Sequence, residues 1–589
     1  MAVRGRATAA TAATAATAPA TATAVIATGH ETRRRLVDVE GLSIGFAGVN
    51  GGRPLVHGVD LRIAAGECVA LVGESGSGKS VIARSLLGLV GDGARIDARR
   101  FDIDGRSALD FSARDWRSMR GTFAGLVMQD ALVSLDPLRR IGAEVGEVLA
   151  RHRLARSRAD QVTRVRDVMR NVGIPEPARR ARQYAHELSG GLRQRALIAA
   201  AIAAAPALII ADEPTTALDA SVQAQVLAVL RARLEQGVGL LLISHDLGVV
   251  ADIADRVLVM QRGEVVDSGT TRAVLRAPSH PYTRQLIAAR PSAQSRGHRL
   301  GSARLVRTGS DTAGMVEVIR DPLPTRVATG DEIVMQVRGL VKRYAGAALT
   351  GPRPGLALDE VSFAIHRGEV LGIVGESGSG KTTCGNIVLG LLAPDAGDVT
   401  FLGQAWAGRG VAERMRYALR PRLQYIPQDP LSSFDPRHTV AELLAQSLYC
   451  HRLDAGQRRE RSVALLEQVG LTAAFLPRRP ATLSGGQRQR VAIARAIAPE
   501  PALIVCDEPV SALDVYVQAQ VLDVLAVLQA RLQMSLLFIS HDLGVIRHVS
   551  DRVLVFKDGR IVESGETSAV FDAPKHAYTR TLLADTPAW

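Results

Sequence analysis

The sequence predicts an α/β protein in which one domain, built on a mostly parallel sheet covered by helices, occurs twice in tandem. Four short segments recur at nearly constant separations of 302, 295, 295 and 296 residues. They are GESGSGKS at 73–80 and GESGSGKT at 375–382, LSGG at 188–191 and 483–486, DEP at 212–214 and 507–509, and SHDLGV at 244–249 and 540–545. An almost constant offset of this size indicates duplication of a whole domain rather than a short-period solenoid.

Short, nearly continuous apolar runs precede these motifs, which is typical of strands covered on both faces. The runs are Cys68–Val72, Leu208–Ala211, Leu240–Ile243 and Val257–Met260 in the first copy, and Val370–Val374, Leu503–Cys506, Leu536–Ile539 and Val553–Phe556 in the second. Stretches with helical spacing separate them, such as Val222–Leu234 and Val517–Leu532. This alternation of strands and helices predicts the parallel sheet.

The order of these signals divides the chain into four parts. Residues 1–35 form an Ala/Thr-rich tract with few large apolar side chains, and we expect it to be disordered. The tract loosely resembles a transit peptide, and an extended or misassigned start explains it equally well. The first domain covers 36–291 and the second 333–589. Residues 292–332 are rich in Ser, Gly, Arg and Thr, which predicts a flexible linker between them.

The composition excludes several function classes. The chain has 589 residues, 47% of them hydrophobic and 22% charged, and no apolar run reaches the ~18 residues that cross a bilayer. We therefore expect a soluble chain, or one that meets a membrane through a partner. Its charge of +13 is spread over many arginines without a basic block, so we expect no nucleic acid partner. The four cysteines form no CxxC pair, which argues against a metal site or a disulfide framework.

The repeated GxxxxGK[ST] segment follows an apolar strand and precedes a helix, which is the context of a P-loop. Glycines let the backbone curl around phosphate, the lysine reaches the β- and γ-phosphates, and the hydroxyl is a ligand for Mg²⁺. The predicted ATP-binding residues of these loops are Gly73, Gly76, Gly78, Lys79 and Ser80, with Gly375, Gly378, Gly380, Lys381 and Thr382 in the second copy. Two matches in matching contexts make a chance occurrence negligible.

Paired acids end one predicted strand in each copy: Asp212 and Glu213, then Asp507 and Glu508. The first acid of each pair suits Mg²⁺ and the second suits a general base for the attacking water. Such a pair alone is more often a solvated strand end. Its position after a P-loop and an LSGG segment favours the catalytic interpretation.

The LSGG segments are predicted to start helices and to bind phosphate. A serine can cap the helix, and the two glycines let a phosphate approach the free N–H groups at its start. The residues concerned are Ser189, Gly190 and Gly191, and Ser484, Gly485 and Gly486. By itself the segment could be an ordinary cap, but the LRQR or QRQR that follows makes it specific.

Taken together, both copies resemble nucleotide-binding domains of the ATP-binding cassette (ABC) superfamily. The resemblance implies that Gln129 and Gln428 are Q-loop glutamines at the Mg²⁺ ion, and that His245 and His541 are the switch histidines that contact the γ-phosphate. It also places Asp219 and Asp514 in D-loops. Phe46 and Tyr344 match the aromatic residue that stacks on adenine, although either could instead belong to the core.

A narrower resemblance points to the oligopeptide, dipeptide and nickel importers. It rests on QDALVSLDP at 129–137 and QDPLSSFDP at 428–436, and on two tails, APSHPYTRQLIAARP at 277–291 and APKHAYTRTLLADTP at 573–587. The first signature departs from the second because Leu192 stands where the second copy has Gln487. Some members hold an iron–sulfur cluster in the tail. Neither tail here contains a cysteine, so we expect none.

The resemblance implies an ATPase, with ATP and Mg²⁺ as cofactors, that drives an importer for di- or oligopeptides or related solutes. Two permease subunits and a solute-binding protein would be its partners, at the cytoplasmic face of the bacterial inner membrane. The alternatives are a soluble two-cassette translation factor on ribosomes, and the ATPase of a nickel or sugar importer. The glycines and prolines within 292–332 argue against the long helical linker of such translation factors.

Because the family pairs its domains head to tail, we expect the two copies to form a dimer within one chain. Each P-loop would then face the LSGG segment of the other copy. The open alternative is a homodimer of chains in which each copy pairs with its twin.

Overall fold

A computed structural model describes residues 33–46, 54–91, 93–129, 131–215, 218–308, 315–326, 330–344, 355–511 and 513–585. The predicted disordered tract, 1–35, lies almost entirely outside the described residues, as do the last two residues of the second tail segment. The chain from Arg35 onward forms one compact unit by its internal contacts.

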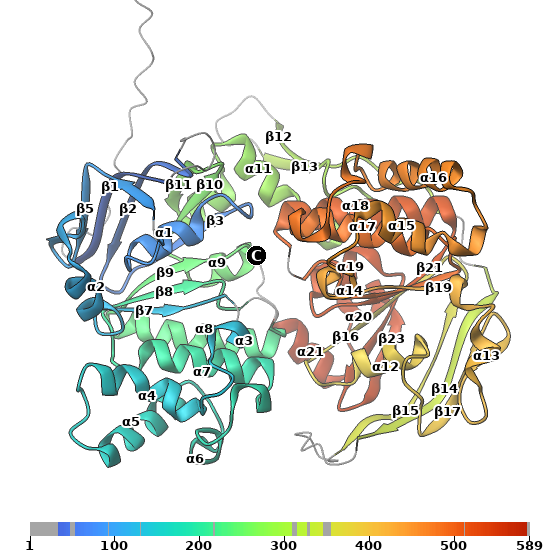
Figure 1. The fold of residues 1–589 in the computed structure, drawn as a ribbon, viewed down its shortest axis with the longest axis horizontal. Helices are drawn as coiled ribbons and strands as arrows, with labels where there is room; N and C mark the ends of the chain where they lie inside the picture. The colour runs from blue at the N-terminus through green and yellow to red at the C-terminus, as the bar shows by residue number, and fades with distance from the viewer. Residues whose placement is uncertain are drawn as a thin grey trace, which may run out of the picture. The chain divides into compact units, whose positions relative to one another are not determined.

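The first domain, drawn from blue to green in Figure 1, contains two sheets. The smaller sheet is antiparallel, has the order β2-β1-β5-β6 with β4 also paired to β1, and was not predicted from the sequence. Its strands are β1 (Arg35–Phe46), β2 (Val56–Ala64), β4 (Ala94–Asp97), β5 (Arg100–Ile103) and β6 (Arg106–Ser107).

The larger sheet has the order β11-β10-β3-β9-β8-β7, with every pair parallel except the one between β10 and β11. Its strands are β3 (Cys68–Gly73), β7 (Ala124–Val127), β8 (Leu208–Asp212), β9 (Gly239–Ile243), β10 (Arg256–Gln261) and β11 (Glu264–Thr270). These bounds confirm the four apolar runs predicted as strands.

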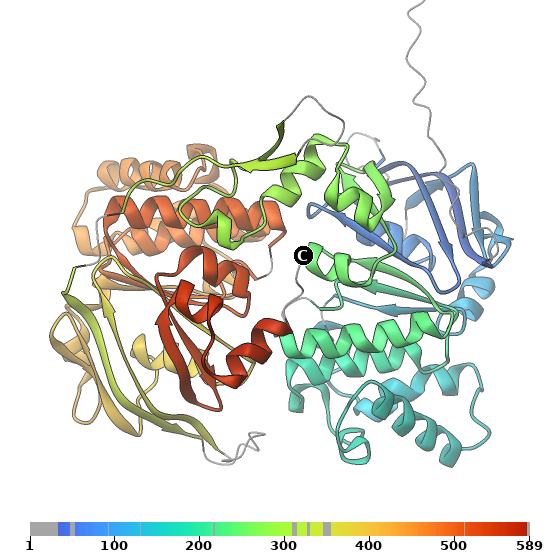
Figure 2. The same cartoon turned by 180° about the vertical axis from the view of Figure 1, so that it is seen from behind.

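Helices cover the larger sheet and form a separate helical layer after β7 (Figures 1 and 2). They are α1 (Lys79–Ser85), α2 (Ala113–Met119), α3 (Ala131–Ser134), α4 (Ile141–Arg151), α5 (Arg158–Asn171), α6 (Pro177–Arg180), α7 (Gly190–Ile202), α8 (Ala220–Glu235), α9 (Leu247–Ile253), α10 (Thr271–Arg276) and α11 (Pro281–Ala288), with 3-10 turns η2 (Ala108–Asp110) and η3 (Ala185–Glu187).

The second domain, drawn from yellow to red, repeats both sheets in the orders β15-β14-β17-β18 and β19-β20-β21-β16-β22-β23. Its strands are β14 (Ile333–Arg343), β15 (Leu356–His366), β16 (Val370–Gly375), β17 (Ala396–Phe401), β18 (Gln404–Ala407), β19 (Leu423–Ile426), β20 (Leu503–Asp507), β21 (Ser535–Ile539), β22 (Arg552–Lys557) and β23 (Arg560–Glu566). Its helices are α12 (Lys381–Val388), α13 (Glu413–Arg416), α14 (Pro430–Ser433), α15 (Val440–Ser447), α16 (Ala455–Gln468), α17 (Gly485–Ile497), α18 (Val515–Leu532), α19 (Leu543–Val549), α20 (Thr567–Asp572) and α21 (Ala577–Ala584), with turns η5 (Arg420–Arg422), η6 (Tyr449–His451), η7 (Ala473–Phe475) and η8 (Pro480–Thr482).

One described helix, α18, is long and apolar enough to cross a membrane by length and composition. It is a core helix of the second domain, because Ala519, Leu522 and Leu525 are buried in the main hydrophobic cluster together with residues of α17. Its Asp523 accepts two backbone hydrogen bonds from the segment between the domains.

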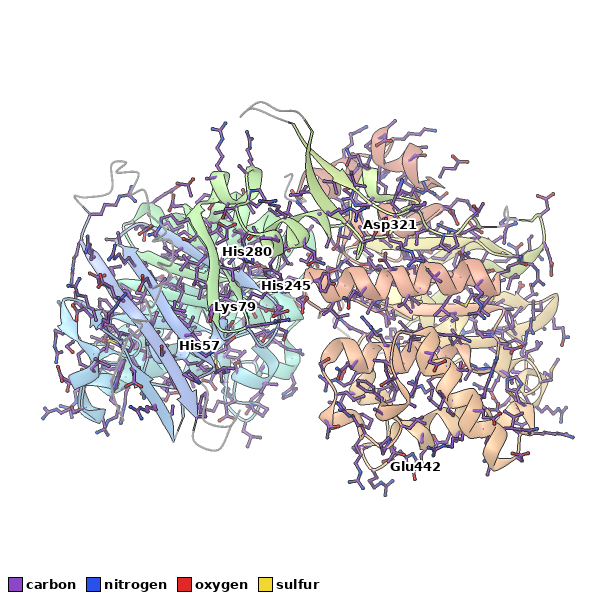
Figure 3. All side chains as sticks on the ribbon, turned by 90° about the horizontal axis from the view of Figure 1, so that it is seen from above. His57, Lys79, His245, His280, Asp321 and Glu442 are labelled. Carbon is purple, nitrogen blue, oxygen red and sulfur yellow. The ribbon has the colours of Figure 1, made fainter. Side chains whose placement is uncertain are left out.

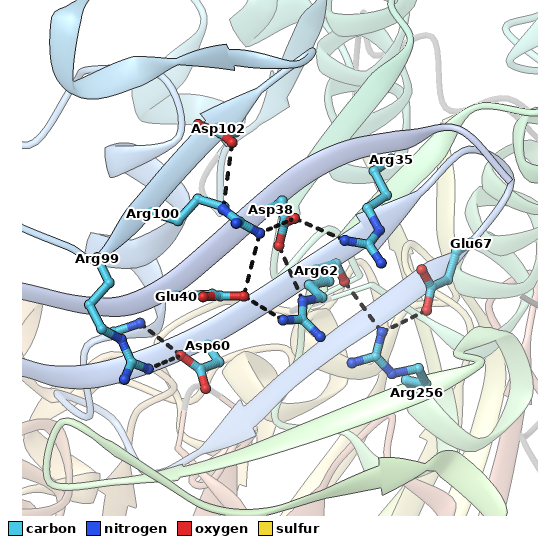
Figure 4. Close-up of polar contacts among 11 residues, drawn as sticks. Arg35, Asp38, Glu40, Asp60, Arg62, Glu67, Arg99, Arg100, Asp102 and Arg256 are labelled. Atoms are coloured by element: carbon cyan, nitrogen blue, oxygen red, sulfur yellow. Dashed lines mark hydrogen bonds and ion pairs between the residues drawn. The ribbon is translucent and has the colours of Figure 1, made fainter. Parts of the chain in front are cut away.

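An ion-pair network holds the antiparallel sheet of the first domain together (Figure 4). Asp38 on β1 is 8% exposed and pairs with Arg62 on β2 and Arg100 on β5. Burial raises the pKa of Asp38, but its hydrogen bonds to Arg35 and Arg62 outweigh burial and leave the pKa below its usual value. Gln336 occupies the equivalent position on β14, so this network belongs to the first domain.

The segment between the domains is ordered where it is described, although the sequence predicts a flexible linker. It contains η4 (Ala293–Ser295) and a hairpin of β12 (Arg304–Thr308) and β13 (Met315–Ile319). The N–H groups of Leu300 and Gly301 donate to Asp523, both at 2.8 Å. Arg326 pairs with Asp551 at 3.1 Å. The described part of the segment therefore packs on the second domain through its contacts with Asp523 and Asp551.

A buried histidine makes this packing sensitive to pH. His548 on α19 is 3% exposed, and its Nδ1 lies 2.9 Å from the Ser295 hydroxyl. Burial, together with the charges of Arg320, Arg326 and Arg296, lowers the pKa of His548 to about 4. The unfolded chain therefore binds the proton first as pH falls from about 6.5 to about 4.

We expect the folded state to lose about 2 kcal/mol of unfolding free energy from this group between pH 7 and pH 5. Urea unfolding at the two pH values measures the loss in the wild type and in His548→Gln, which lacks the titrating ring. Equal losses in the two proteins would show that His548 does not cause the pH dependence.

Candidate functional site

The first phosphate-binding loop connects β3 to α1. Gly73 has φ +147°, and an added Cβ would lie 2.1 Å from the carbonyl oxygen of Met260, so this position requires glycine. Gly76 and Gly78 also have positive φ, and Gly78 is the N-cap of α1. The Nζ of Lys79 donates to the carbonyls of Gly73 and Glu74 at 2.9 and 2.7 Å. The loop thus curls around its own lysine.

The second loop, between β16 and α12, repeats this geometry. An added Cβ at Gly375, which has φ +149°, would lie 2.3 Å from the carbonyl oxygen of Phe556. Gly378 and Gly380 also have positive φ. Lys381 donates to the carbonyls of Gly375 and Glu376, both at 2.7 Å. Burial lowers the pKa of Lys381, partly offset by the charges of Glu508 and nearby aspartates.

The predicted metal-binding side chains lie beside each loop. Ser80, the second residue of α1, donates its hydroxyl to Asp212 Oδ1 at 3.1 Å. Burial raises the pKa of Asp212. At the equivalent Asp507, burial and the charge of Glu508 raise the pKa to about 6.

The predicted general bases sit at the centre of a polar cluster in both copies. Glu213 adopts a left-handed backbone with φ +49°, immediately after β8. Its Oε2 accepts a hydrogen bond from Gln129 Nε2 at 2.8 Å and lies 3.2 Å from His245 Nδ1. Lys79 and His245 of this site are labelled in Figure 3. Three residues predicted separately from the sequence are therefore in direct contact.

The second copy brings the equivalent residues together at almost the same distances. Glu508, with φ +48°, accepts from Gln428 Nε2 at 2.8 Å and lies 3.1 Å from His541 Nδ1. Burial lowers the pKa of His541, but the hydrogen bond and charge of Glu508 outweigh burial and leave the pKa raised. Burial raises the pKa of Glu508, but the hydrogen bond and the charge of His541 outweigh burial and leave this pKa below its usual value. Both effects favour a carboxylate paired with a protonated histidine.

The two candidate adenine-stacking residues differ in their surroundings. Tyr344 is 39% exposed and lines a cavity of about 300 Å³ together with Lys381, Thr382 and Gln428. Phe46 is partly buried and packs against the hydrophobic core of the first domain. The geometry therefore favours the stacking prediction for Tyr344 and the core alternative for Phe46.

The LSGG segments start α7 and α17 as predicted. Ser189 and Ser484 cap these helices, and Ser484 forms a reciprocal capping box with Gln487 that Leu192 cannot form in the first copy. Side chains at Gly191 and Gly486 would collide with Val222 and Val517, so these glycines allow close helix packing. Gly190 faces open space, and a Cβ at Gly485 would meet Leu513 at 3.4 Å, so approach to these helix starts remains open.

Two hydrogen bonds connect the copies at their phosphate loops. The Ser377 N–H donates to Asp219 Oδ2 at 2.8 Å, and the Ser75 N–H donates to Asp514 Oδ2 at 3.3 Å. Each aspartate also caps the following helix through its other carboxylate oxygen. The D-loop of each copy therefore touches the phosphate loop of the other.

Comparisons with known proteins agree with this geometry. Residues 56–216 and 358–511 match the family described as ABC transporter. The chain belongs to this family. Both copies are therefore ABC cassettes, and the chain is an ATPase. Residues 266–309 and 562–589 match the C-terminal region of oligopeptide/dipeptide transporters, and the first of these matches runs past residue 291, where we predicted the first cassette to end.

Two curated relatives span almost the whole chain. The glutathione import ATP-binding protein GsiA of Salmonella choleraesuis is 40% identical over 566 residues, which are 94% of this chain and 90% of that protein. The peptidoglycan transport ATP-binding protein YejF of Agrobacterium fabrum is 40% identical over 553 residues, with coverages of 93% and 96%. Both names describe ATP-binding proteins of transport systems.

Among solved structures, archaeal ribosome recycling factor aABCE1 in complex with ribosomal stalk protein aP1 matches with a TM-score of 0.56. It shares 22% identity and covers 89% of this chain and 90% of its own. At this identity the match shows a shared two-cassette fold and nothing about function.

Sequence reasoning missed two tyrosines at the second site. Tyr425 on β19 interacts with Asp507, and Leu126 occupies the equivalent position on β7. Tyr578 on α21 accepts a hydrogen bond from the backbone N–H of Glu376 at 3.1 Å. Both contacts join residues far apart in the chain, and no local pattern signals them.

Proposed function

We propose that this chain couples ATP hydrolysis to the import of short peptides or peptide-containing solutes. The observation that carries the proposal is the combination of two equally built sites, Gln129–Glu213–His245 and Gln428–Glu508–His541, with two peptide-transporter tails. Relatives named for glutathione and peptidoglycan transport support this substrate class.

In this proposal each side chain acts on the triphosphate or on the attacking water. The loop amides and Lys79 or Lys381 bind the phosphates, as such loops do. Glu213 and Glu508 accept the proton of the water, and their contacts with glutamine and histidine orient them. His245 and His541, which carry raised pKa values, can direct positive charge at the γ-phosphate.

The residues present also fit a Mg²⁺ ion. Ser80 and Asp212 already place a hydroxyl and a carboxylate 3.1 Å apart, and Gln129 uses its amide nitrogen toward Glu213, which leaves its oxygen for the metal. Thr382, Asp507 and Gln428 supply the same donors in the second site. Oxygen donors of this kind suit Mg²⁺, and an ion held by these residues would neutralise the negative charge of the bound phosphates.

Each site would be completed by the LSGG helix start of the other cassette. Ser484, Gly485 and Gly486 would complete the site at Lys79, and Ser189, Gly190 and Gly191 the site at Lys381. The D-loop contacts Asp219–Ser377 and Asp514–Ser75 support a head-to-tail pair within one chain. A helix N-terminus favours bound phosphate through its free N–H groups and its dipole.

Partners of the importer class would supply the path and the selectivity. We propose two permease subunits and a solute-binding protein, with this chain at the cytoplasmic face of a bacterial inner membrane. A surface groove of about 380 Å³ supports a protein partner of the first cassette. Its lining includes the buried Leu197 and Ala201 and the charged Arg117, Glu147 and Arg151, a combination that suits a short amphipathic helix.

The rival functions are less well supported. The described residues of 292–332 form a turn and a hairpin instead of the long helical linker that the ribosome-acting alternative predicts. A sugar-importer tandem ATPase would be expected to carry one degenerate cassette, and here both cassettes make the same Gln–Glu–His contacts.

An uptake experiment tests the proposed substrate class. Cells that lack this gene should lose ATP-dependent uptake of labelled short peptides, wild-type protein should restore it, and a variant with both Glu213 and Glu508 replaced by Gln should not. Purification of the tagged chain from membranes should bring down permeases. Unchanged peptide uptake in the deletion strain, or recovery with ribosomes instead of permeases, would contradict the proposal.

A further inference from the structure

The histidine of the tail motif His-Pro/Ala-Tyr-Thr-Arg caps a short helix in both cassettes. In the first tail, the Tyr282 N–H donates to His280 Nδ1 at 3.2 Å, so the histidine caps α11. In the second, the Tyr578 N–H donates to His576 Nδ1, also at 3.2 Å. The motif therefore begins a short helix and fixes the direction of the tyrosine that follows.

A carboxylate on the last strand anchors each tail. Asp267 on β11 accepts hydrogen bonds from the N–H groups of Ser279 and His280 at 3.0 and 3.1 Å. Glu563 on β23 accepts from Lys575 and His576 at 2.8 and 3.1 Å. Asp267 and Glu563 thus attach the backbone just before each tyrosine to the edge strand of the larger sheet.

From this position, the second tail reaches the phosphate loop. Tyr578 is 7% exposed, and its hydroxyl oxygen accepts the N–H of Glu376, the residue that follows Gly375 in GESGSGKT. Lys557, at the end of β22, lies with its Nζ 4.6 Å from the centre of the Tyr578 ring. Burial raises the pKa of Tyr578, so the hydroxyl stays protonated at neutral pH.

The first tail places the equivalent tyrosine beside the first loop, where its contact with the loop amide is weaker. Tyr282 is 7% exposed, and its buried hydroxyl makes no hydrogen bond of ordinary geometry among the described residues. Burial and the charge of Glu74 raise the pKa of Tyr282, and the backbone N–H of Glu74 lies close enough to the hydroxyl to lower it in part. Gln261 occupies the position of Lys557, so the lysine that lies over the second tyrosine ring has no counterpart at this position.

The contacted amide lies at the start of the glycine-rich part of the loop. Gly375, Gly378 and Gly380 all have positive φ, and because glycine lacks a Cβ their backbones can also leave this phosphate-binding conformation. Glu376 follows the first of these glycines. A hydrogen bond at that point reduces the entropy that the loop loses when it closes around phosphate.

We propose that Tyr578 is a positioning residue for the second phosphate loop, so that the peptide-importer tail sets the ATP affinity of its own cassette. Tyr282 occupies the same place in the first cassette, where its contact with the Glu74 amide is weaker and restrains the loop less. The inference rests on the proposed phosphate-binding role of the loops and is independent of the transported solute.

The test uses the full chain with one site studied at a time. In a Lys79→Ala background, Tyr578→Phe removes the hydroxyl and keeps the ring. We expect the affinity for a fluorescent ATP analogue, and 1/KM for ATP, to fall about 3- to 10-fold, the range for losing one hydrogen bond, with kcat within 2-fold. In a Lys381→Ala background, Tyr282→Phe should change affinity less than about 2-fold. Tyr449→Phe, at an exposed tyrosine on η6, is the matched control.

A second readout separates positioning from a loss of folding. Hydrogen exchange of the peptide spanning 370–382 should speed up in Tyr578→Phe and not in Tyr449→Phe. Unchanged affinity and exchange in Tyr578→Phe, or a lower kcat at constant KM, would overturn the inference. The proposed site itself fails separately if Lys381→Ala leaves ATP binding at the second site intact.

Discussion

Replacing both Glu213 and Glu508 by Gln is expected to reduce ATP turnover at least about 100-fold, while ATP binding stays close to that of the wild type. General-base catalysis contributes about 10²- to 10⁴-fold, and an amide cannot accept the proton of the attacking water. Binding should survive because glutamine is nearly isosteric with glutamate, and because Lys79 and Lys381 donate to carbonyl oxygens of their own loops.

We expect the single variants Glu213→Gln and Glu508→Gln to reduce ATP turnover to a similar extent. Glu213 and Glu508 each contact a glutamine at 2.8 Å and a histidine near 3.2 Å, so neither site is visibly impaired. Phosphate release measures turnover, and equilibrium binding of labelled ATP measures affinity. Glu467→Gln, at an exposed position on α16, is the control. Near-normal hydrolysis by the double variant would remove both residues from the catalytic role.

Much of the parallel sheet and of each site could be predicted because the signals are local. The apolar run Val370–Val374 and the loop beginning at Gly375 are adjacent in sequence, and the structure places them as strand and turn. Gln428, Glu508 and His541 are each predicted as site residues from a separate short motif. Their mutual contact follows from a parallel sheet, whose strand ends lie at one edge.

The features that sequence reasoning missed depend on contacts between distant residues. Bulges interrupt the pairing of β1 with β2, for example between Val39 and Leu42, so the alternation that would indicate an antiparallel sheet is broken. The segment 292–332 has a linker composition, yet Asp523 and Asp551 of the second cassette give it a docking surface. The content of Ser, Gly, Arg and Thr in 292–332 predicts a linker, but it does not reveal that Asp523 and Asp551 lie where they can bind the segment.

The arrangement of the two cassettes can be tested by crosslinking within the chain. The Ser377 N–H lies 2.8 Å from Asp219 of the first cassette, and the LSGG segment of that cassette precedes Asp219 by about one helix and one strand. Ser377 is exposed, and a side chain at Gly190 would meet open space. Cysteines at these two positions therefore fit the structure without strain.

The experiment is done in a chain without other cysteines and with both catalytic glutamates replaced by Gln, which keeps ATP bound. Ser377→Cys with Gly190→Cys should form a disulfide in most molecules when ATP is added, because ATP would bring the LSGG helix start onto the second phosphate loop. When isotope-labelled and unlabelled chains are mixed, the joined peptides should both come from the same chain.

A matched pair distinguishes the two possible arrangements of cassettes. Ser377→Cys with Gly485→Cys places both thiols in the second cassette, where they can meet only if that cassette pairs with its twin in another chain. Head-to-tail pairing within the chain predicts abundant product from the Gly190 pair and little from the Gly485 pair, whereas a homodimer of chains predicts the reverse, with mixed isotope labels. The Asp219–Ser377 and Asp514–Ser75 hydrogen bonds favour the first outcome, since each D-loop already reaches the opposite phosphate loop in a single chain.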